Sequence, residues 1–232
     1  MKLYLDTTDV CDVSKYMNTG LIDGVTTNFT HLLMTGRKPH DIYHELKMMG
    51  VKDIHMEIVG ETPFIVKEAM KLQDEFGELC TIKVPCNREG LDACRELKKN
   101  LIKTNVTFIF CAAQAILAAK AGATFVSPAV GICDDNSVAG LEVVRSIAEL
   151  YGRQRVQTEV IASCIKDVYK VTRAFYNGAD IVTMPPNIFE KMYHHVLSDA
   201  GIKQYYTEWT KFGGPGTNPP LDLGFGGELS SS

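Results

Sequence analysis

The sequence lacks the features of a disulfide-stabilised or nucleic-acid-binding protein. Its seven cysteines contain no CxxC pair, and an odd number cannot all pair within one chain. This pattern is typical of reduced thiols and predicts a cytoplasmic location. The 24 Lys and Arg residues do not outnumber the 28 Asp and Glu residues, and the net charge is −4. A broad nucleic-acid-binding surface is therefore not expected.

Long apolar runs are also missing. None approaches the roughly 18 residues that a membrane-spanning helix needs, so no membrane insertion is expected. The chain opens with Met-Lys-Leu-Tyr-Leu-Asp, which is typical of a strand rather than of a signal peptide. With 232 residues, of which 45% are hydrophobic, the chain is long enough to bury a substantial core as one domain.

Strand-like and helix-like segments alternate along the chain. Strands are predicted at residues 2–6, 24–28, 53–59, 80–85, 104–110, 124–130, 156–162 and 180–184. Helices are predicted at residues 40–49, 63–76, 90–99, 112–121, 138–151 and 167–176. Eight strands alternating with helices indicate an α/β fold in which a parallel sheet closes into a (β/α)8 TIM barrel.

The composition changes near the C-terminus. We expect residues 1–211 to form a single barrel domain that ends in a C-terminal helix. Residues 212–232 are rich in Gly, Pro and Ser without apolar periodicity, which predicts a flexible tail. Docking of this tail on a neighbouring subunit is the alternative.

Lys83 is unusual because it lies within the apolar segment Cys80-Thr81-Ile82-Lys83-Val84-Pro85. Burial of an unpaired ammonium group is costly and favours the neutral amine, which is a nucleophile toward carbonyl groups. Lys83 is therefore a candidate for forming a Schiff base. The alternative is a lysine that extends from a strand end to solvent.

Further polar residues lie near the ends of the predicted strands, where barrel enzymes place their active sites. Alternate side chains of a strand share a face, which pairs Asn105 with Thr107 and Ser127 with Ala129. An inert barrel would carry Val, Ile and Leu there, so the pattern indicates a functional site. The remaining candidates are Asp6, Asn28, Glu57 and Cys164.

This set of residues is suited to carbon–carbon bond cleavage. Attack of Lys83 on a ketone gives a carbinolamine and then an iminium ion, which withdraws electrons from the bond that breaks. Asp6 and Glu57 are the carboxylates available for proton transfer, and Thr107 is placed to hold a water between Glu57 and the imine.

The substrate expected from these residues is a small sugar or other carbonyl compound. Asn28, Asn105 and Ser127 offer neutral hydrogen bonds to the hydroxyl groups of a small polyol. The reaction needs no cofactor and no metal, and the spacing of the histidines does not indicate a metal site.

Seven segments of the chain carry recognisable motifs. They are Asp6-Thr7, Asp23-Gly24-Val25-Thr26-Thr27-Asn28, Ile82-Lys83-Val84-Pro85, Asn105-Val106-Thr107, Ala112-Ala113-Gln114-Ala115, Ala118-Ala119-Lys120-Ala121-Gly122-Ala123-Thr124 and Val126-Ser127-Pro128. These segments resemble the transaldolase family, in particular the short subfamily that includes fructose-6-phosphate aldolases and small phage-borne transaldolases. The resemblance covers about residues 1–211.

The resemblance implies a barrel with the Schiff-base residue Lys83 on its fourth strand. It implies Asp6 as the general acid and base, and Glu57 with Thr107 as a water-mediated proton relay. It also implies that three residues bind the dihydroxyacetone part of the substrate, namely Asn28, Asn105 and Ser127. Short members of the family are commonly decamers of pentameric rings that exchange their C-terminal helices, so a homo-oligomer is expected.

Three functions remain open at this level. Glutamate at position 57 resembles the transaldolase branch, whereas the aldolase branch carries glutamine there. The leading hypothesis is therefore transfer of a dihydroxyacetone unit between sugar or sugar-phosphate carbonyl compounds. A lyase that releases the three-carbon unit, or that performs aldol chemistry on other carbonyl compounds, is the second. The third is a barrel without catalysis that binds a small metabolite.

The sequence departs from the family pattern at clustered positions. Phe29 stands where the family has proline, and Cys111 where it has serine. Four changes fall beside the expected phosphate and acceptor pocket: Ala129 replaces an aromatic residue, Ile132 and Lys166 replace arginines, and Cys164 replaces a serine.

Loss of guanidinium groups removes bidentate phosphate contacts. The changes therefore predict a wider, more apolar pocket and a specificity shifted away from phosphorylated substrates. The alternative is that neighbouring residues compensate and ordinary transaldolase activity survives. Natural divergence and engineering of the pocket are both compatible with this one sequence.

Overall fold

The computed structural model describes residues 1–211, and it contains the closed parallel barrel that the sequence predicts. Each strand pairs with the next in parallel, and β8 closes the ring on β1. The strands are β1 (Lys2–Asp6), β2 (Gly24–Thr26), β3 (Ile54–Glu57), β4 (Cys80–Pro85), β5 (Lys103–Ile109), β6 (Phe125–Pro128), β7 (Glu159–Ala162) and β8 (Ile181–Met184).

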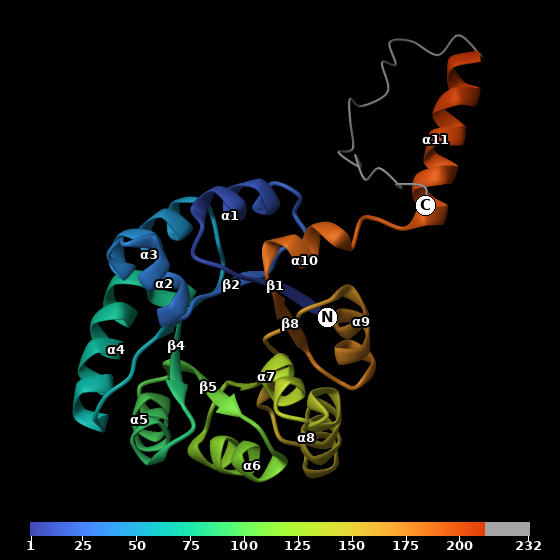
Figure 1. Ribbon diagram of the computed structural model, residues 1–232. Helices are drawn as coiled ribbons and strands as arrows, with labels where there is room; N and C mark the ends of the chain where they lie inside the picture. The colour runs from blue at the N-terminus through green and yellow to red at the C-terminus, as the bar shows by residue number, and fades with distance from the viewer. Residues whose placement is uncertain (212–232) are drawn as a thin grey trace. The chain divides into compact units, whose positions relative to one another are not determined.

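Helices surround the strands and cover the outside of the barrel (Figure 1). They are α1 (Val10–Met17), α2 (Phe29–Thr35), α3 (Pro39–Met48), α4 (Thr62–Phe76), α5 (Arg88–Lys99), α6 (Ala112–Ala121), α7 (Val130–Asp135), α8 (Gly140–Gln154) and α9 (Val168–Tyr176). The chain continues with α10 (Pro186–Lys191) and α11 (Val196–Lys211). The six helices predicted from periodicity are α3, α4, α5, α6, α8 and α9.

Side chains capable of capping define where several helices begin. Asp9 accepts hydrogen bonds from the first backbone N–H groups of α1, and Asn28, Asn87 and Asp167 do the same for α2, α5 and α9. Such caps satisfy N–H groups that have no partner within the helix. At Asn28 the cap also ends the second strand earlier than the sequence predicts.

The inside of the barrel contains a small apolar layer. Tyr4, Phe125, Ile161 and Ile181 form a buried cluster there, separate from the larger core between strands and helices. Gly24 leaves room for the Tyr4 ring, because a Cβ at this position would lie 2.7 Å from ring atoms of Tyr4. The interior is therefore filled by side chains and is not an open pore.

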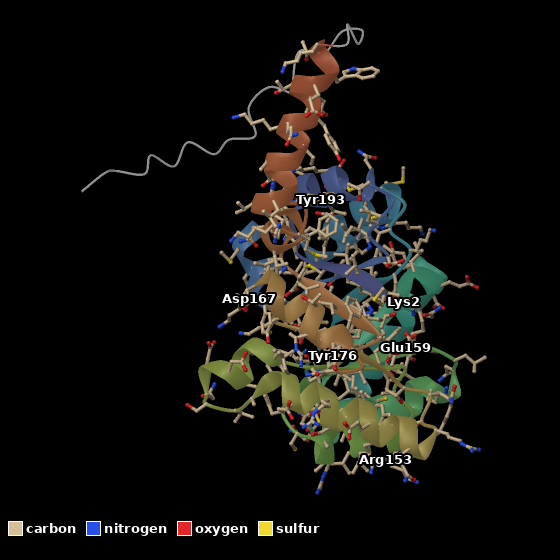
Figure 2. The ribbon with its side chains drawn as sticks, turned by 90° about the vertical axis from the view of Figure 1, so that its right-hand side faces the viewer. Lys2, Arg153, Glu159, Asp167, Tyr176 and Tyr193 are labelled. Carbon is tan, nitrogen blue, oxygen red and sulfur yellow. The ribbon has the colours of Figure 1, made fainter. Side chains whose placement is uncertain are left out.

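Charged pairs lie at the N-terminal ends of the strands, below this layer. Lys2 and Glu159 lie side by side with Nζ 2.8 Å from Oε2, on the face shown in Figure 2. Lys103 Nζ lies 2.7 Å from Oδ1 of Asp53. These pairs close the barrel at the end opposite to the predicted active site.

Contacts divide the chain into two units, Met1–Phe189 and Glu190–Ser232. The first unit contains the barrel and its core. In the second, α11 has no buried side chain. The predicted tail at residues 212–232 lies outside the described residues. None of the helices within residues 1–211 is both long and apolar enough to cross a membrane.

Candidate active site

A cavity of about 450 Å³ opens among the C-terminal ends of the strands. It brings together every site residue predicted from the sequence except Lys166. The predicted residues that line it are Asp6, Asn28, Glu57, Lys83, Asn105, Thr107, Ser127, Ala129, Ile132 and Cys164. The cavity wall as a whole includes residues of β1 to β6 and β8, of α2 and α7, and of the loop after β7.

Lys83 is held inside the barrel and does not extend to solvent. Its side chain is 12% exposed, and Nζ donates a hydrogen bond to the backbone oxygen of Thr27 at 3.0 Å. Nζ also lies 3.6 Å from Oε1 of Glu57, whose side chain is 6% exposed. At this distance, and largely shielded from solvent, the ammonium and the carboxylate attract each other electrostatically.

Strand register explains why three of the polar residues meet. Glu57 pairs with Lys83 across β3 and β4, and Lys83 pairs with Asn105 across β4 and β5. Paired residues on neighbouring parallel strands face the same side of a sheet. The carboxylate, the amine and the amide consequently lie in one row on the inner wall.

Asp6 lies at the cavity wall beside two hydrogen-bond donors, Thr26 and Asn28, and near the ring of His31. Its Oδ1 is 3.2 Å from Oγ1 of Thr26, 3.4 Å from Nδ2 of Asn28 and 3.8 Å from Nδ1 of His31. Thr26 also shares a hydrogen bond of 2.7 Å with Thr183. These contacts fix the carboxylate while leaving it at the cavity wall.

Glu57 has a second partner at the start of α2. Its Oε2 accepts a hydrogen bond from the backbone N–H of Phe29 at 3.2 Å. One carboxylate oxygen thus faces Lys83 while the other is held by backbone. This arrangement restricts rotation of the carboxylate relative to the amine.

A buried hydrogen-bond chain, which the sequence did not indicate, leads from the cavity into the barrel. Ser127 Oγ donates to Oδ1 of Asn105 at 2.8 Å, which turns the amide nitrogen of Asn105 toward Nδ1 of His55, 2.9 Å away. Nδ1 must then accept, so Nε2 carries the proton and donates to Oδ2 of Asp53 at 3.1 Å. His55 is completely buried.

Asp53 anchors this chain. Besides His55, it accepts hydrogen bonds from Tyr4 at 2.8 Å, Thr81 at 2.6 Å and Lys103 at 2.7 Å. Burial alone would raise the pKa of Asp53, but the contacts with His55 and Lys103 outweigh it and hold the pKa well below its usual range. Burial and the nearby Asp53 carboxylate raise the pKa of Tyr4 far above its usual value.

Strand alternation predicts that His55 faces into the barrel, but alternation alone does not mark it as a residue of the site. His55 precedes Glu57 by two positions on β3, so both side chains point into the barrel. Other residues of the cavity wall also escaped the sequence interpretation. They are Thr26, Thr30, His31, Val59, Phe108, Ser163 and Thr183, and the wall also includes Phe29, which the sequence singles out only as a departure from the family pattern.

The four departures expected beside the phosphate and acceptor pocket divide into two groups. Ala129, Ile132 and Cys164 line the cavity, and burial raises the pKa of the Cys164 thiol. Lys166 does not line the cavity, because its amine forms an ion pair with Asp135 at the end of α7. Among residues 1–211, this part of the cavity wall therefore carries no arginine and no free lysine.

Comparison with known proteins gives a consistent result over nearly the whole chain. The family described as transaldolase/fructose-6-phosphate aldolase matches residues 3–212. A probable transaldolase of Paracoccus denitrificans is 38% identical over 214 residues, which is 92% of this chain and 98% of the relative. Probable transaldolases of Caulobacter vibrioides and Rhizobium meliloti are 37% and 38% identical over the same shares of both chains.

Proposed function

Because this chain belongs to the transaldolase/fructose-6-phosphate aldolase family, we propose that it is a class I aldolase that forms a Schiff base on Lys83. The observation that carries the proposal is the position of the Lys83 amine. It is buried, lines the cavity and lies 3.6 Å from the carboxylate of Glu57. A buried amine beside a proton acceptor is the arrangement that carbonyl addition requires.

The proposed reaction begins with attack of the Lys83 nitrogen on the substrate ketone. The carbinolamine loses water with a proton supplied by Glu57, through a water held by Thr107, and becomes an iminium ion. Asp6 then removes the proton from the hydroxyl group two carbons from the iminium carbon. The carbon–carbon bond breaks, its electron pair moves to the iminium as an enamine, and an aldehyde leaves.

The fate of the three-carbon unit that stays on Lys83 distinguishes a transferase from a lyase. Addition of the enamine to an aldehyde acceptor, with Asp6 returning its proton to the new alkoxide, regenerates an iminium ion on Lys83, and its hydrolysis by water completes transfer of a dihydroxyacetone unit. Protonation of the enamine and hydrolysis gives release. We favour transfer, because a carboxylate at Glu57 resembles the transaldolase branch. In either case Asn28, Asn105 and Ser127 would bind the hydroxyl groups of this unit.

We also propose that specificity is shifted away from phosphorylated substrates. Three small or apolar residues, Ala129, Ile132 and Cys164, occupy the part of the cavity wall expected to lie beside the substrate phosphate and the acceptor. Lys166 is engaged by Asp135. A phosphate dianion would lose charge-assisted hydrogen bonds there, each worth about 1.5–3 kcal/mol.

Assembly into a homo-oligomer is a further part of the proposal. Helix α11 exposes large apolar side chains that include Val196, Leu197, Tyr205 and Trp209. Such a helix gains free energy when a neighbouring subunit covers it. Exchange of this helix between subunits of a pentamer or decamer would cover these side chains.

All seven cysteines, which lie within the described residues, are free thiols, and this supports a cytoplasmic location.

Borohydride trapping followed by peptide mass spectrometry tests the central step. The native chain and Lys83→Met are incubated with dihydroxyacetone, fructose 6-phosphate or an uncharged aromatic β-hydroxyketone. We expect a reduced adduct on Lys83 with the uncharged compounds, a weaker one with the sugar phosphate, and none in the variant. Equal trapping of the sugar phosphate would refute the shifted specificity, and absence of any Lys83 adduct would refute the Schiff base.

The transferase and lyase alternatives need a separate measurement. Turnover of a ketose donor is followed with and without an added aldehyde acceptor. A transferase turns over repeatedly only when the acceptor is present, whereas a lyase releases the three-carbon unit without it. Turnover that does not respond to the acceptor would therefore favour the lyase.

A further inference from the structure

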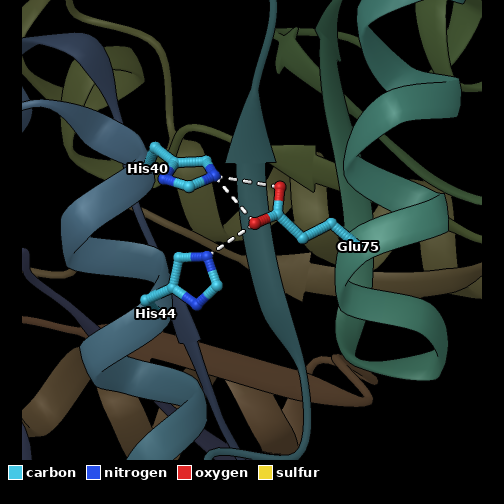
Figure 3. A group of neighbouring side chains, drawn as sticks. All are labelled: His40, His44 and Glu75. Atoms are coloured by element: carbon cyan, nitrogen blue, oxygen red, sulfur yellow. Dashed lines mark hydrogen bonds and ion pairs between the residues drawn. The ribbon is translucent and has the colours of Figure 1, made fainter.

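A second group of chemically active side chains lies on the outer helices. His40 and His44 of α3 face Glu75 of α4 (Figure 3), and none of the three lines the barrel cavity. We propose that these residues form a binding site for one divalent transition-metal ion of borderline softness, such as Zn²⁺, Ni²⁺ or Co²⁺. Two imidazole nitrogens and one carboxylate oxygen are a ligand set that such ions prefer.

The backbone places the two imidazoles on one face. His40 and His44 are four residues apart within α3, so their side chains are neighbours on one side of the helix. Both Nε2 atoms point at the carboxylate of Glu75 (Figure 3): His40 Nε2 lies 2.9 Å from Oε2, and His44 Nε2 lies 2.6 Å from Oε1. The three ligand atoms lie within 4.8 Å of one another.

At these distances, only a small movement of the side chains is needed for an ion to enter. Ligands 2.0–2.1 Å from a tetrahedral metal are about 3.4 Å from one another. The nitrogen–oxygen distances must therefore open by about 0.5 Å for His40 and about 0.8 Å for His44. The side chains of His40, His44 and Glu75 are between 36% and 54% exposed, so they can move by this amount. The remaining coordination positions face solvent and would hold water.

Packing restricts the imidazole rings before an ion binds. The centroid of the His44 ring lies 5.0 Å from that of the buried Phe76 ring. The His40 and His44 rings form an edge contact with their centroids 4.6 Å apart. Lys47 donates to the backbone oxygen of Glu75 at 3.0 Å, which ties the end of α4 to α3. The positive charge of Lys47 opposes the ion, so we expect a reversible site rather than a permanently filled one.

The sequence does not reveal this site, although it contains part of the pattern. The expectation that the histidine spacing indicates no metal site did not consider His40 and His44, which lie four residues apart within α3. Glu75 follows His44 by 31 residues and reaches it only because α3 and α4 are neighbours. A bound ion would link the two helices that precede and follow β3, the strand that carries Glu57. We therefore expect the ion to stabilise this part of the barrel without taking part in bond cleavage.

Calorimetric titration of the untagged, chelator-treated full chain with Zn²⁺ tests the site. Native protein is compared with His40→Ala/His44→Ala, with Glu75→Gln, and with His194→Ala/His195→Ala as a control that removes the same number of imidazoles elsewhere. We expect one ion per chain in the native and control proteins. Glu75→Gln should weaken binding at least about tenfold, and the His40/His44 double variant should lose it.

Two further readouts test the ligand type and the link between binding and stability. Co²⁺ spectra report thiolate ligation by a near-ultraviolet charge-transfer band, which should be absent if Cys11 and Cys111, the exposed cysteines, are not involved. At a concentration 100-fold above Kd, Zn²⁺ should raise the Tm of native protein by about 5–10 °C and leave the double variant unchanged. Equal binding by native protein and the double variant, or no binding by native protein, would overturn the proposal.

Discussion

The backbone N–H of Phe29 donates a hydrogen bond to Oε2 of Glu57, with 3.2 Å between nitrogen and oxygen. The family pattern that the sequence resembles has proline at this position, and proline has no N–H to donate. In this chain, therefore, the proposed proton relay has a backbone contact that the proline-containing pattern does not allow. The other oxygen of the carboxylate is left to face Lys83.

Two substitutions separate the N–H of Phe29 from its ring. Phe29→Ala removes the ring and keeps the N–H, whereas Phe29→Pro removes both. Phe29 is the first residue of α2, where proline is tolerated, so both variants should fold. We expect kcat of Phe29→Pro to be roughly tenfold below that of Phe29→Ala, because a hydrogen bond to a charged group is lost. Steady-state kinetics with a common donor measure the difference, and equal kcat values would show that the contact has no catalytic role.

Asn105 is the residue through which His55 should influence the reaction. His55→Leu removes the acceptor for the Asn105 amide and leaves a buried N–H group unpaired, which costs about 1–3 kcal/mol. We expect kcat/KM to fall roughly 5- to 150-fold if that cost falls on the bound substrate. His55→Gln supplies a side-chain oxygen as acceptor and should recover part of the loss.

The His55 variants need a readout that a simple loss of stability would not move. Initial rates are therefore measured well below the Tm of each variant, alongside borohydride trapping on Lys83. A positioning role predicts that KM for the donor rises while Lys83 can still be trapped at saturating donor. Unchanged kinetics in a destabilised His55→Leu would limit the residue to a structural role.

The strands of this barrel are predictable because buried strands form short apolar runs between turn residues. The predicted segment 80–85 coincides with β4 (Cys80–Pro85). The predicted segment 156–162 begins too early, because the N–H of Val156 bonds to the oxygen of Tyr151 at the end of α8 and not to a strand. The short helices α1, α2, α7 and α10 contain too few turns for a periodic pattern to identify them.

The candidate site is predictable only where strand alternation decides the outcome. The positions of Lys83 and Glu57 follow from the ends of their own strands. The contact between His55 and Asn105 joins residues 50 positions apart and depends on the register of three strands. The ion pair of Lys166 with Asp135 joins two segments outside the barrel strands, and no periodicity specifies such a contact.

Ile132 offers a direct test of phosphate recognition. It lines the cavity from α7, so Ile132→Arg would place a guanidinium group at the position where the family pattern has arginine. We expect KM for a phosphorylated substrate to fall roughly ten- to hundredfold, because a charge-assisted hydrogen bond is gained. Ile132→Met keeps the apolar character and serves as the control.

Comparison of two substrates identifies the cause of any change at Ile132. KM for an unphosphorylated ketose should stay within about twofold in Ile132→Arg, because that substrate has no dianion for the guanidinium group to bind. The gain for the phosphorylated substrate should also weaken at high salt. A similar fall in KM for both substrates would contradict phosphate recognition at this position.

Asp53 and Glu159 allow an ion pair with a buried carboxylate to be compared with a half-exposed ion pair in the same barrel. Asp53→Asn leaves Lys103 without its counter-ion and weakens the hydrogen bond of His55. We expect it to lower the free energy of unfolding at pH 7 by about 3–5 kcal/mol. Glu159→Gln breaks the pair with Lys2, whose side chain is 43% exposed, and should cost at most about 1 kcal/mol.

The stabilising effect of Asp53 should depend on pH in a defined direction. The pKa of Asp53 in the folded protein lies below its usual value, so the unfolded chain binds a proton first as the pH falls. The contribution is therefore complete above about pH 5 and declines below about pH 4, near the pKa of an unfolded Asp. Urea unfolding at pH 7, 5 and 3 should show the same advantage of the native protein over Asp53→Asn at the two higher values and a partly reduced advantage at pH 3. An advantage that is the same at all three values would contradict an ionised, paired Asp53.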